Sequence, residues 1–244
     1  MDAYREMVSA DAKAKVEQIP ALIEGHLAFI REAFTKSQAD VRTELSSSPA
    51  DLAAGKTNAT MVALLLQLND SLATDIEVLA SLAQWIALHV PVVEDGNNFG
   101  CDVQAHVYKV IKESCTALQT TQDSLATYHN DRAGALDKVV SFPTKKVTNS
   151  SSKSNTTGGK EEEAGEKSDV SESTEESRTE KAVLQDYVEY VNMVDLKWYN
   201  KMKAAAMKMT EALAVAGDTV VKNMEKLEDP RGESGGGSKG FNMY

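Results

Sequence analysis

Side chains that bind metals or carry out acid–base catalysis are few in this chain, and their spacing does not match known sites. A di-iron site in a helical bundle needs a Glu three residues before a His. The four histidines are His26, His89, His106 and His129. The residues three positions before them are Ile23, Ile86, Val103 and Ala126. His-Glu-x-x-His is also absent. We therefore predict no metal site and no cofactor.

Other catalytic patterns are incomplete as well. Gly235 and Gly240 have the spacing of a phosphate-binding loop, but Phe241 stands where that loop requires Lys. A Gly-x-Ser-x-Gly elbow between a strand and a helix does not occur. Cys101 and Cys115 are too far apart in sequence for a paired zinc motif, and two cysteines do not form a disulfide framework. We interpret them as reduced thiols on a helix. The sequence predicts no catalytic residues, and an enzyme is the least favoured interpretation.

The most distinctive stretch lies between two long helical patterns. Pro91 lacks a backbone N–H and ends the helical pattern before it. Gly96 and Gly100 permit a positive φ, and Asn97 and Asn98 tolerate one better than most residues. The seven residues that end this stretch are Glu94, Asp95, Gly96, Asn97, Asn98, Phe99 and Gly100. They predict a turn of defined shape, although an ordinary interhelical loop is the alternative.

Two segments carry a resemblance to a known family. Glu94–Gly100 resembles the activation loop of the 11S proteasome activator family, also called PA28 or REG. The stretch Lys222–Glu233, continuing to Met243 and Tyr244, resembles the C-terminus of the same family. The two matches occur in the family's order, which makes the resemblance specific.

The resemblance implies a fold and a function. Members of the family are four-helix subunits that form a heptameric ring and cap the 20S proteasome without ATP. Their C-terminal tails insert between subunits of the α ring, and their activation loops reposition the turns that hold its gate shut. For this chain, the resemblance implies an activation loop at Glu94–Gly100 and a docking tail formed by Phe241, Asn242, Met243 and Tyr244. It implies the 20S α-subunit ring as partner, and a homo- or hetero-heptamer.

Composition limits the other partners. The formal net charge of −11 argues against nucleic acid or an anionic membrane, because both require a basic face. No N-terminal apolar run suggests a signal peptide, and no run of 18 apolar residues suggests a membrane span. We therefore expect a protein of the cytoplasm, the nucleus or both, with no nucleic-acid or membrane partner.

Apolar periodicity predicts an all-α chain. Residues recurring every three or four positions indicate long helices over about 4–45, 57–90, 101–140 and 180–227. We expect Pro20 to kink or split the first of these helices. The 42% hydrophobic content is sufficient for a core. We predict one up-down-up-down four-helix bundle domain spanning residues 1–244.

Two segments fall outside the helical pattern. Residues 144–178 are first rich in Ser, Thr and Asn and then acidic, with too few apolar side chains to offset the entropy lost on ordering. We interpret them as a disordered insert, and phosphorylation of serines among its acids is the less favoured alternative to a plain linker. Residues 229–244 are rich in glycine and are interpreted as a flexible docking tail.

Alternating helices carry one further consequence. They place the second interhelical loop and the C-terminal tail at the same end of the bundle, and the acidic insert at the other. Relative to vertebrate members of the family, the insert has moved to the link between the third and fourth helices, and the tail carries an extra Gly- and Ser-rich segment at 234–238. A helical scaffold or adaptor is the main alternative, and an amphipathic lipid-surface protein is a weaker one.

Overall fold

The computed structural model describes residues 1–92, 98–140 and 172–232, and up to residue 184 the last range is described as backbone alone. Within these ranges the chain contains seven helices and no strand. The helices are α1 (Asp2–Ala33), α2 (Gln38–Leu45), α3 (Pro49–Ala53), α4 (Ala59–Leu88), α5 (Phe99–Leu125), α6 (Tyr128–Val140) and α7 (Glu172–Glu228).

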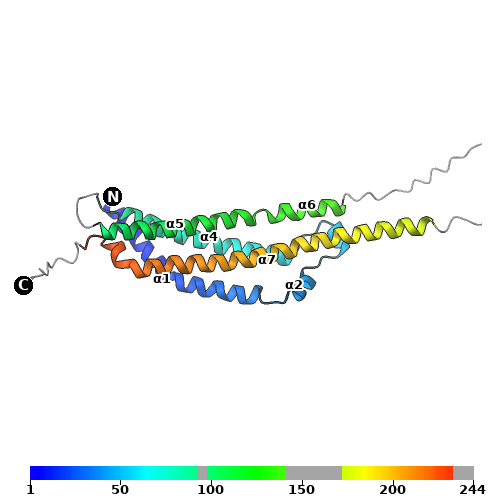
Figure 1. The fold of residues 1–244 in the computed structure, drawn as a ribbon, viewed down its shortest axis with the longest axis horizontal. Helices are drawn as coiled ribbons and strands as arrows, with labels where there is room; N and C mark the ends of the chain where they lie inside the picture. The colour runs from blue at the N-terminus through cyan, green and yellow to red at the C-terminus, as the bar shows by residue number, and fades with distance from the viewer. Residues whose placement is uncertain (93–97, 141–171, 233–244) are drawn as a thin grey trace, which may run out of the picture.

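The long helices form an elongated antiparallel bundle (Figure 1). α1 and α5 run in one direction, and α4 and α7 run in the other. α6 continues the line of α5, and α2 and α3 lie at the turn between α1 and α4. α4 packs against α1 and α5, and α7 packs against α1, α5 and α6. The predicted all-α, up-down-up-down architecture is confirmed.

The core consists of the apolar stripes that the sequence predicts. On α4 the stripe is largely buried, whereas Val90, beyond the helix end, is 55% exposed. On α7 the largest buried side chain is Trp198, and Met202 and Met209 are buried on the same helix. Aromatic rings fill the space between α6 and α7, where Tyr128 and Trp198 have centroids 5.9 Å apart.

The prediction of one continuous helix over residues 4–45 is wrong. α1 ends at Ala33, and α2 begins after Ser37, whose hydroxyl accepts a hydrogen bond from the Asp40 N–H at 3.2 Å. A Ser N-cap starts a new helix by satisfying an otherwise unpaired amide. Pro20 does not split α1, which is continuous through it. Burial of Ile19 against α7 helps to hold the helix across the missing N–H.

The prediction of one continuous helix over residues 101–140 is also wrong. The backbone turns at 126–127 between α5 and α6. There the Thr127 N–H bonds the carbonyl of Ser124 rather than a residue four back, and the Thr127 hydroxyl bonds the same carbonyl at 2.7 Å. Local hydroxyl-to-carbonyl bonds compete with the helical pattern.

The prediction that the acidic insert extends to residue 178 is wrong for residues 172–178. α7 begins at Glu172, so residues 172–178 are helical, whereas the sequence prediction placed the start near 180. These residues include Glu and Arg, which favour helix. The insert up to residue 171, including its serines at 168 and 171, lies outside the described residues.

α4 is apolar enough, by length and composition, to pass for a membrane span. In contrast, no run of apolar residues in the sequence is long enough to suggest a membrane span. Leu68, Leu72 and Leu82 of this helix are fully buried in the bundle, whereas Leu66 is 58% exposed. Among the described residues it is the one helix that meets these criteria, and the core helix of a bundle meets them as well.

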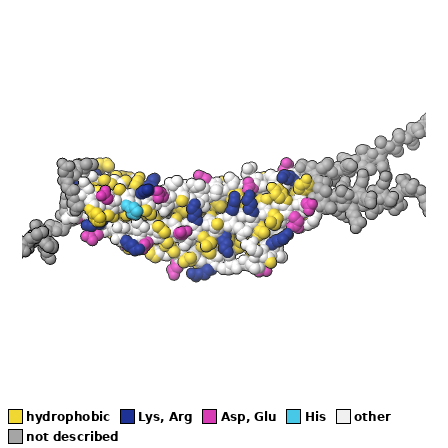
Figure 2. Space-filling view, viewed as in Figure 1, with side chains coloured by type: hydrophobic (Ala, Val, Ile, Leu, Met, Phe, Trp, Pro, Cys, Tyr) yellow, Lys and Arg dark blue, Asp and Glu magenta, His cyan; other side chains and the backbone are white. Residues whose placement is uncertain are grey.

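The visible surface mixes charges of both signs. On the face in Figure 2, Lys and Arg side chains alternate with Asp and Glu along the bundle, with apolar side chains between them. This face therefore offers no broad basic area of the kind that nucleic acid requires.

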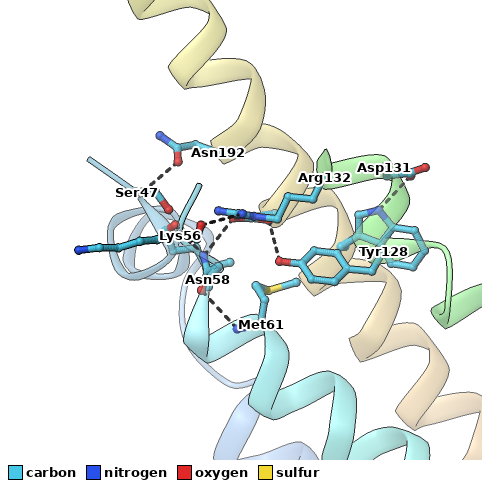
Figure 3. Close-up of polar contacts among 11 residues, drawn as sticks. Ser47, Lys56, Asn58, Met61, Tyr128, Asp131, Arg132 and Asn192 are labelled. Carbon is cyan, nitrogen blue, oxygen red and sulfur yellow. Dashed lines mark hydrogen bonds and ion pairs between the residues drawn. The ribbon is translucent and has the colours of Figure 1, made fainter. Parts of the chain in front are cut away.

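A buried ion pair stabilises the half of the bundle remote from the start of α5. Arg132 on α6 donates from Nε to both carboxylate oxygens of Asp195 on α7, at 3.1 and 3.2 Å. Its Nη1 donates to the Lys56 carbonyl, and Asn58 caps α4 through the Met61 N–H (Figure 3). These contacts join α6, α7 and the start of α4.

Candidate functional site

The helix ends that carry the two distinctive sequence segments meet at one end of the bundle. α4 ends at Leu88, α5 begins at Phe99 and α7 ends at Glu228, all at the end where α1 begins (Figure 1). The prediction that the loop and the tail leave from the same end is therefore confirmed for their described bases. We call the described residues at this end, 88–92, 98–104 and 227–232, the docking end.

Only part of the predicted site can be placed. Asn98, Phe99 and Gly100 are described. Glu94, Asp95, Gly96 and Asn97 lie outside the described residues, as do Phe241, Asn242, Met243 and Tyr244. What the structure shows is the base of the loop and the point from which the tail departs.

Gln104 joins the three helices of the docking end. Its side chain is fully buried, and Nε2 donates to the carbonyls of His89 and Leu227, both at 3.1 Å. These carbonyls lie at the C-terminal ends of α4 and α7, where carbonyls have no partner within their own helix. The side-chain amide of Gln104 therefore donates one hydrogen bond to the end of α4 and one to the end of α7, and so holds the two helix ends together. The sequence pattern did not lead us to predict this role.

Gly100 has a different role from the one predicted. It lies in the first turn of α5 and is not among the described glycines with positive φ. A Cβ at this position would lie 1.8 Å from the Pro230 carbonyl oxygen. Glycine is required because the backbone after α7 passes directly against the start of α5.

The chain after α7 is fixed in a turn before it continues. Gly232 has φ of 73°, and its N–H bonds the side chain of Asp229 at 2.8 Å. Arg231 Nη2 donates to the Val92 carbonyl at 2.6 Å. The prediction of a flexible tail from residue 229 is therefore wrong for 229–232, because glycine and proline here form a defined turn against the loop base.

His89 links this end to the start of α1. Its Nδ1 lies 2.8 Å from the Trp85 carbonyl, and its Nε2 lies 3.1 Å from the Ser9 hydroxyl. A carbonyl can only accept, so Nδ1 carries a proton, and in the neutral imidazole Nε2 accepts from the Ser9 hydroxyl. The Ser9 oxygen in turn accepts from the Trp85 indole N–H at 3.0 Å. The network fixes the end of α4 and explains why the histidine lies at this position.

Exposed apolar side chains gather at the docking end and on the neighbouring start of α1. Val92 is 77% exposed and Phe99 is 67% exposed. The others are Met1, Tyr4, Met7 and Val90. Asn98 precedes α5 and is exposed, yet its side chain makes no capping hydrogen bond to that helix. Exposed apolar side chains next to polar ones are typical of surfaces that bind other proteins.

The buried charges elsewhere serve the fold. His26 on α1 donates from Nε2 to the Asp75 carboxylate on α4, at 2.9 and 3.1 Å. Burial raises the pKa of Asp75 above its usual value, and the hydrogen bond from His26 opposes this in part. Among the described residues, no three His, Cys, Asp or Glu side chains are grouped as a metal site would need.

Comparison with known proteins identifies the family. The model of the family described as "Proteasome activator PA28, C-terminal" matches residues 54–148 and 174–237, well over half of the chain. The human protein "Proteasome activator complex subunit 3" is 20% identical over 176 residues, which are 72% of this chain and 54% of that protein. The chain therefore spans about half the length of this curated relative.

Solved structures show the same fold. The 11S subunit of the Plasmodium falciparum proteasome, PA28, superposes with a TM-score of 0.63 at 18% identity, covering 94% of this chain and 92% of that one. The mutated P26 activator in a complex with the archaeal 20S proteasome gives 0.64 at 15% identity, covering 95% and 96%. A family of activators regulates rather than catalyses, in agreement with the prediction that the chain is not an enzyme. On the extent of the family match, this chain belongs to the proteasome activator PA28 family.

Proposed function

We propose that this protein is an ATP-independent activator of the 20S proteasome. The observation that carries the proposal is the joint at the docking end, where Gln104, Gly100 and Arg231 hold the base of the loop against the start of the tail. In this proposal the docking end faces the α-subunit ring of the core. The P26 activator, which is similar in fold, was solved in complex with an archaeal 20S proteasome, and this supports the same partner here.

The two segments divide the work. The tail, through Phe241–Tyr244, binds the α ring, and the loop, Glu94–Gly100, repositions the gate so that short peptides can pass. A loop held by a rigid base can press on its partner without losing its own shape. Asn98 and Phe99 are exposed beside that base, and among the described residues we propose that these two make the contact.

A ring makes such binding effective. A single flexible tail loses entropy when it becomes ordered, so it binds weakly. Several tails on one assembly act together, and avidity raises the affinity by a factor of roughly 10² or more. We therefore propose self-association as a heptamer, homomeric or heteromeric. Cys101 and Cys115 are free thiols, which fits the cytoplasm or the nucleus as the location.

Peptide hydrolysis tests the proposal. A latent 20S core from the same source is given a short fluorogenic peptide, with the intact protein or with a variant lacking Asn242–Tyr244. The intact protein is expected to stimulate hydrolysis, and the shortened variant is not. If a well-folded intact protein leaves hydrolysis unchanged, the activator function is refuted.

Mass in solution separates the ring from the scaffold alternative. A heptamer of this 26.4 kDa chain has a mass about seven times larger, and this is the expected result. A monomer or dimer that ignores the 20S core would favour a helical adaptor.

A further inference from the structure

Gln104 is a buried side chain that cannot reach a partner protein, yet it bonds the two helix ends from which the loop and the tail depart. Its amide nitrogen carries two hydrogens, and each is donated to the carbonyl at the end of a different helix. We propose that Gln104 is a positioning residue for activation: it sets the base of the activation loop relative to the exit of the tail. This inference rests on the proposed function.

The two carbonyls come from segments far apart in the chain. His89 directly follows α4, where the chain leaves for the loop, and Leu227 is in the last turn of α7, 123 residues beyond Gln104. Leu227 is fully buried, so its carbonyl lies where water is a poor substitute for a protein donor. Removing the amide would release both helix ends from the same point.

Two neighbouring contacts also connect the base of the loop to the turn that follows α7. One turn before Gln104, Gly100 lies against the Pro230 backbone. Beyond it, Arg231 reaches across to the Val92 carbonyl, at the start of the loop. Movement of the tail exit is therefore transmitted to the loop base, because all three contacts connect the same two regions of the chain.

The choice of Gln is informative in itself. Gln104 lies on the buried stripe of α5, in line with Val107 and Ile111, where an apolar side chain would pack without a polar cost. Its Oε1 is buried and has no hydrogen-bond partner among the described residues. The two hydrogen bonds that its amide donates account for a polar side chain at this buried position.

The test separates binding from activation. Gln104→Met keeps the length of the side chain and removes both donors. Gln122→Met is the matched control, since Gln122 lies on the same helix and donates to Asn69 of α4 in the middle of the bundle. For both variants, ring mass, affinity for the 20S core and hydrolysis at saturating activator are measured.

We expect Gln104→Met to bind the core with an affinity within about threefold of the parent, while stimulation at saturation falls about tenfold. Gln122→Met should leave both quantities unchanged. Full stimulation by Gln104→Met would overturn the inference, as would a loss of affinity large enough to account for the lost stimulation.

Two further outcomes are distinguishable. If the intact protein itself does not stimulate hydrolysis, the proposed function fails, and the inference fails with it. If Gln104→Met does not form the parental assembly, Gln104→Asn replaces it, since its amide is one carbon shorter and cannot reach both carbonyls. The same separation of binding from stimulation is then expected, and equal stimulation by Gln104→Asn would overturn the inference.

Discussion

At the scale of single residues, the most consequential groups are polar side chains inside the apolar stripes. Asp195 is fully buried and accepts from Arg132, Tyr128 and Asn58. Periodicity predicts which positions are buried, but it does not say which polar residue there finds a partner. Gln104 could have been noticed as an amide in register with Val107 and Ile111. Its partners could not, because helix ends are brought together only by the fold.

Removing the Asp195 carboxylate tests the buried network. Asp195→Ala leaves Arg132 as an unpaired buried charge, so we expect the free energy of unfolding to fall by about 3–5 kcal/mol. Urea denaturation measures this. Asp218, exposed and paired with Lys222, provides the control: Asp218→Ala is expected to change stability by less than about 1 kcal/mol. Equal effects of the two variants would contradict the assigned role of Asp195.

The pair of His26 and Asp75 predicts a dependence on pH. Burial raises the pKa of Asp75 above its usual 3.8, so the folded chain retains this proton to higher pH than the unfolded chain. The resulting contribution to stability is present below that value and is lost as pH rises through the raised pKa.

Asp75→Asn removes this titration. We therefore expect the parent to lose stability relative to the variant as pH rises above about 4 and through the raised pKa of Asp75. Denaturation midpoints of the two proteins across this range provide the measurement. If the parent instead gains stability over the variant, the bond with His26 outweighs burial.

At the scale of helices, the sequence predicts which face of each helix is buried better than it predicts where each helix begins and ends. The stripes of α4, α5 and α7 were predicted because burial repeats every three or four residues. The breaks at 34–37 and 126–127 were not predicted, because they depend on single hydroxyls such as Ser37 and Thr127 that bond nearby backbone. Pro20 shows the reverse case, in which packing preserves a helix against a local signal.

Two helical glycines test the packing between helices. Gly134 on α6 has nothing within 4 Å of an added Cβ, so Gly134→Ala should raise the free energy of unfolding by about 0.5–1 kcal/mol. At Gly217 on α7, the added Cβ would lie 2.8 Å from Ile19 Cγ2 of α1.

In Gly217→Ala this clash should cancel the stability gained by replacing a helical glycine. We therefore expect the free energy of unfolding of Gly217→Ala to be lower than that of Gly134→Ala by about 1 kcal/mol or more. Thermal or urea denaturation of the two variants gives the comparison. An equal rise in stability would mean that α1 and α7 can separate at this point without cost.

At the scale of the whole molecule, topology explains why two distant segments can act together. An up-down-up-down bundle returns its fourth helix to the end where its second and third are joined. The family match, over residues 54–148 and 174–237, includes both Glu94–Gly100 and the end of α7. The contacts of Gln104, Gly100 and Arg231 that fix this end of the bundle are not predicted by the sequence pattern. The sequence suggests that Gly100 permits a positive φ, whereas in the structure it allows the backbone of Pro230 to approach closely.

The most direct test of the proposed activation is competition at the 20S core by a variant altered in the loop. Asn98→Tyr adds bulk at an exposed residue that makes no capping bond to α5, so folding and tail binding should persist. Preformed assemblies of the variant are mixed with intact assemblies and a latent core, and hydrolysis of a fluorogenic peptide is followed.

We predict that Asn98→Tyr alone gives no stimulation and that, in excess, it suppresses stimulation by the intact protein, since it occupies the same sites without opening the gate. Stimulation equal to that of the intact protein would contradict the role given to the loop. Failure to compete would contradict the assignment of binding to the tail.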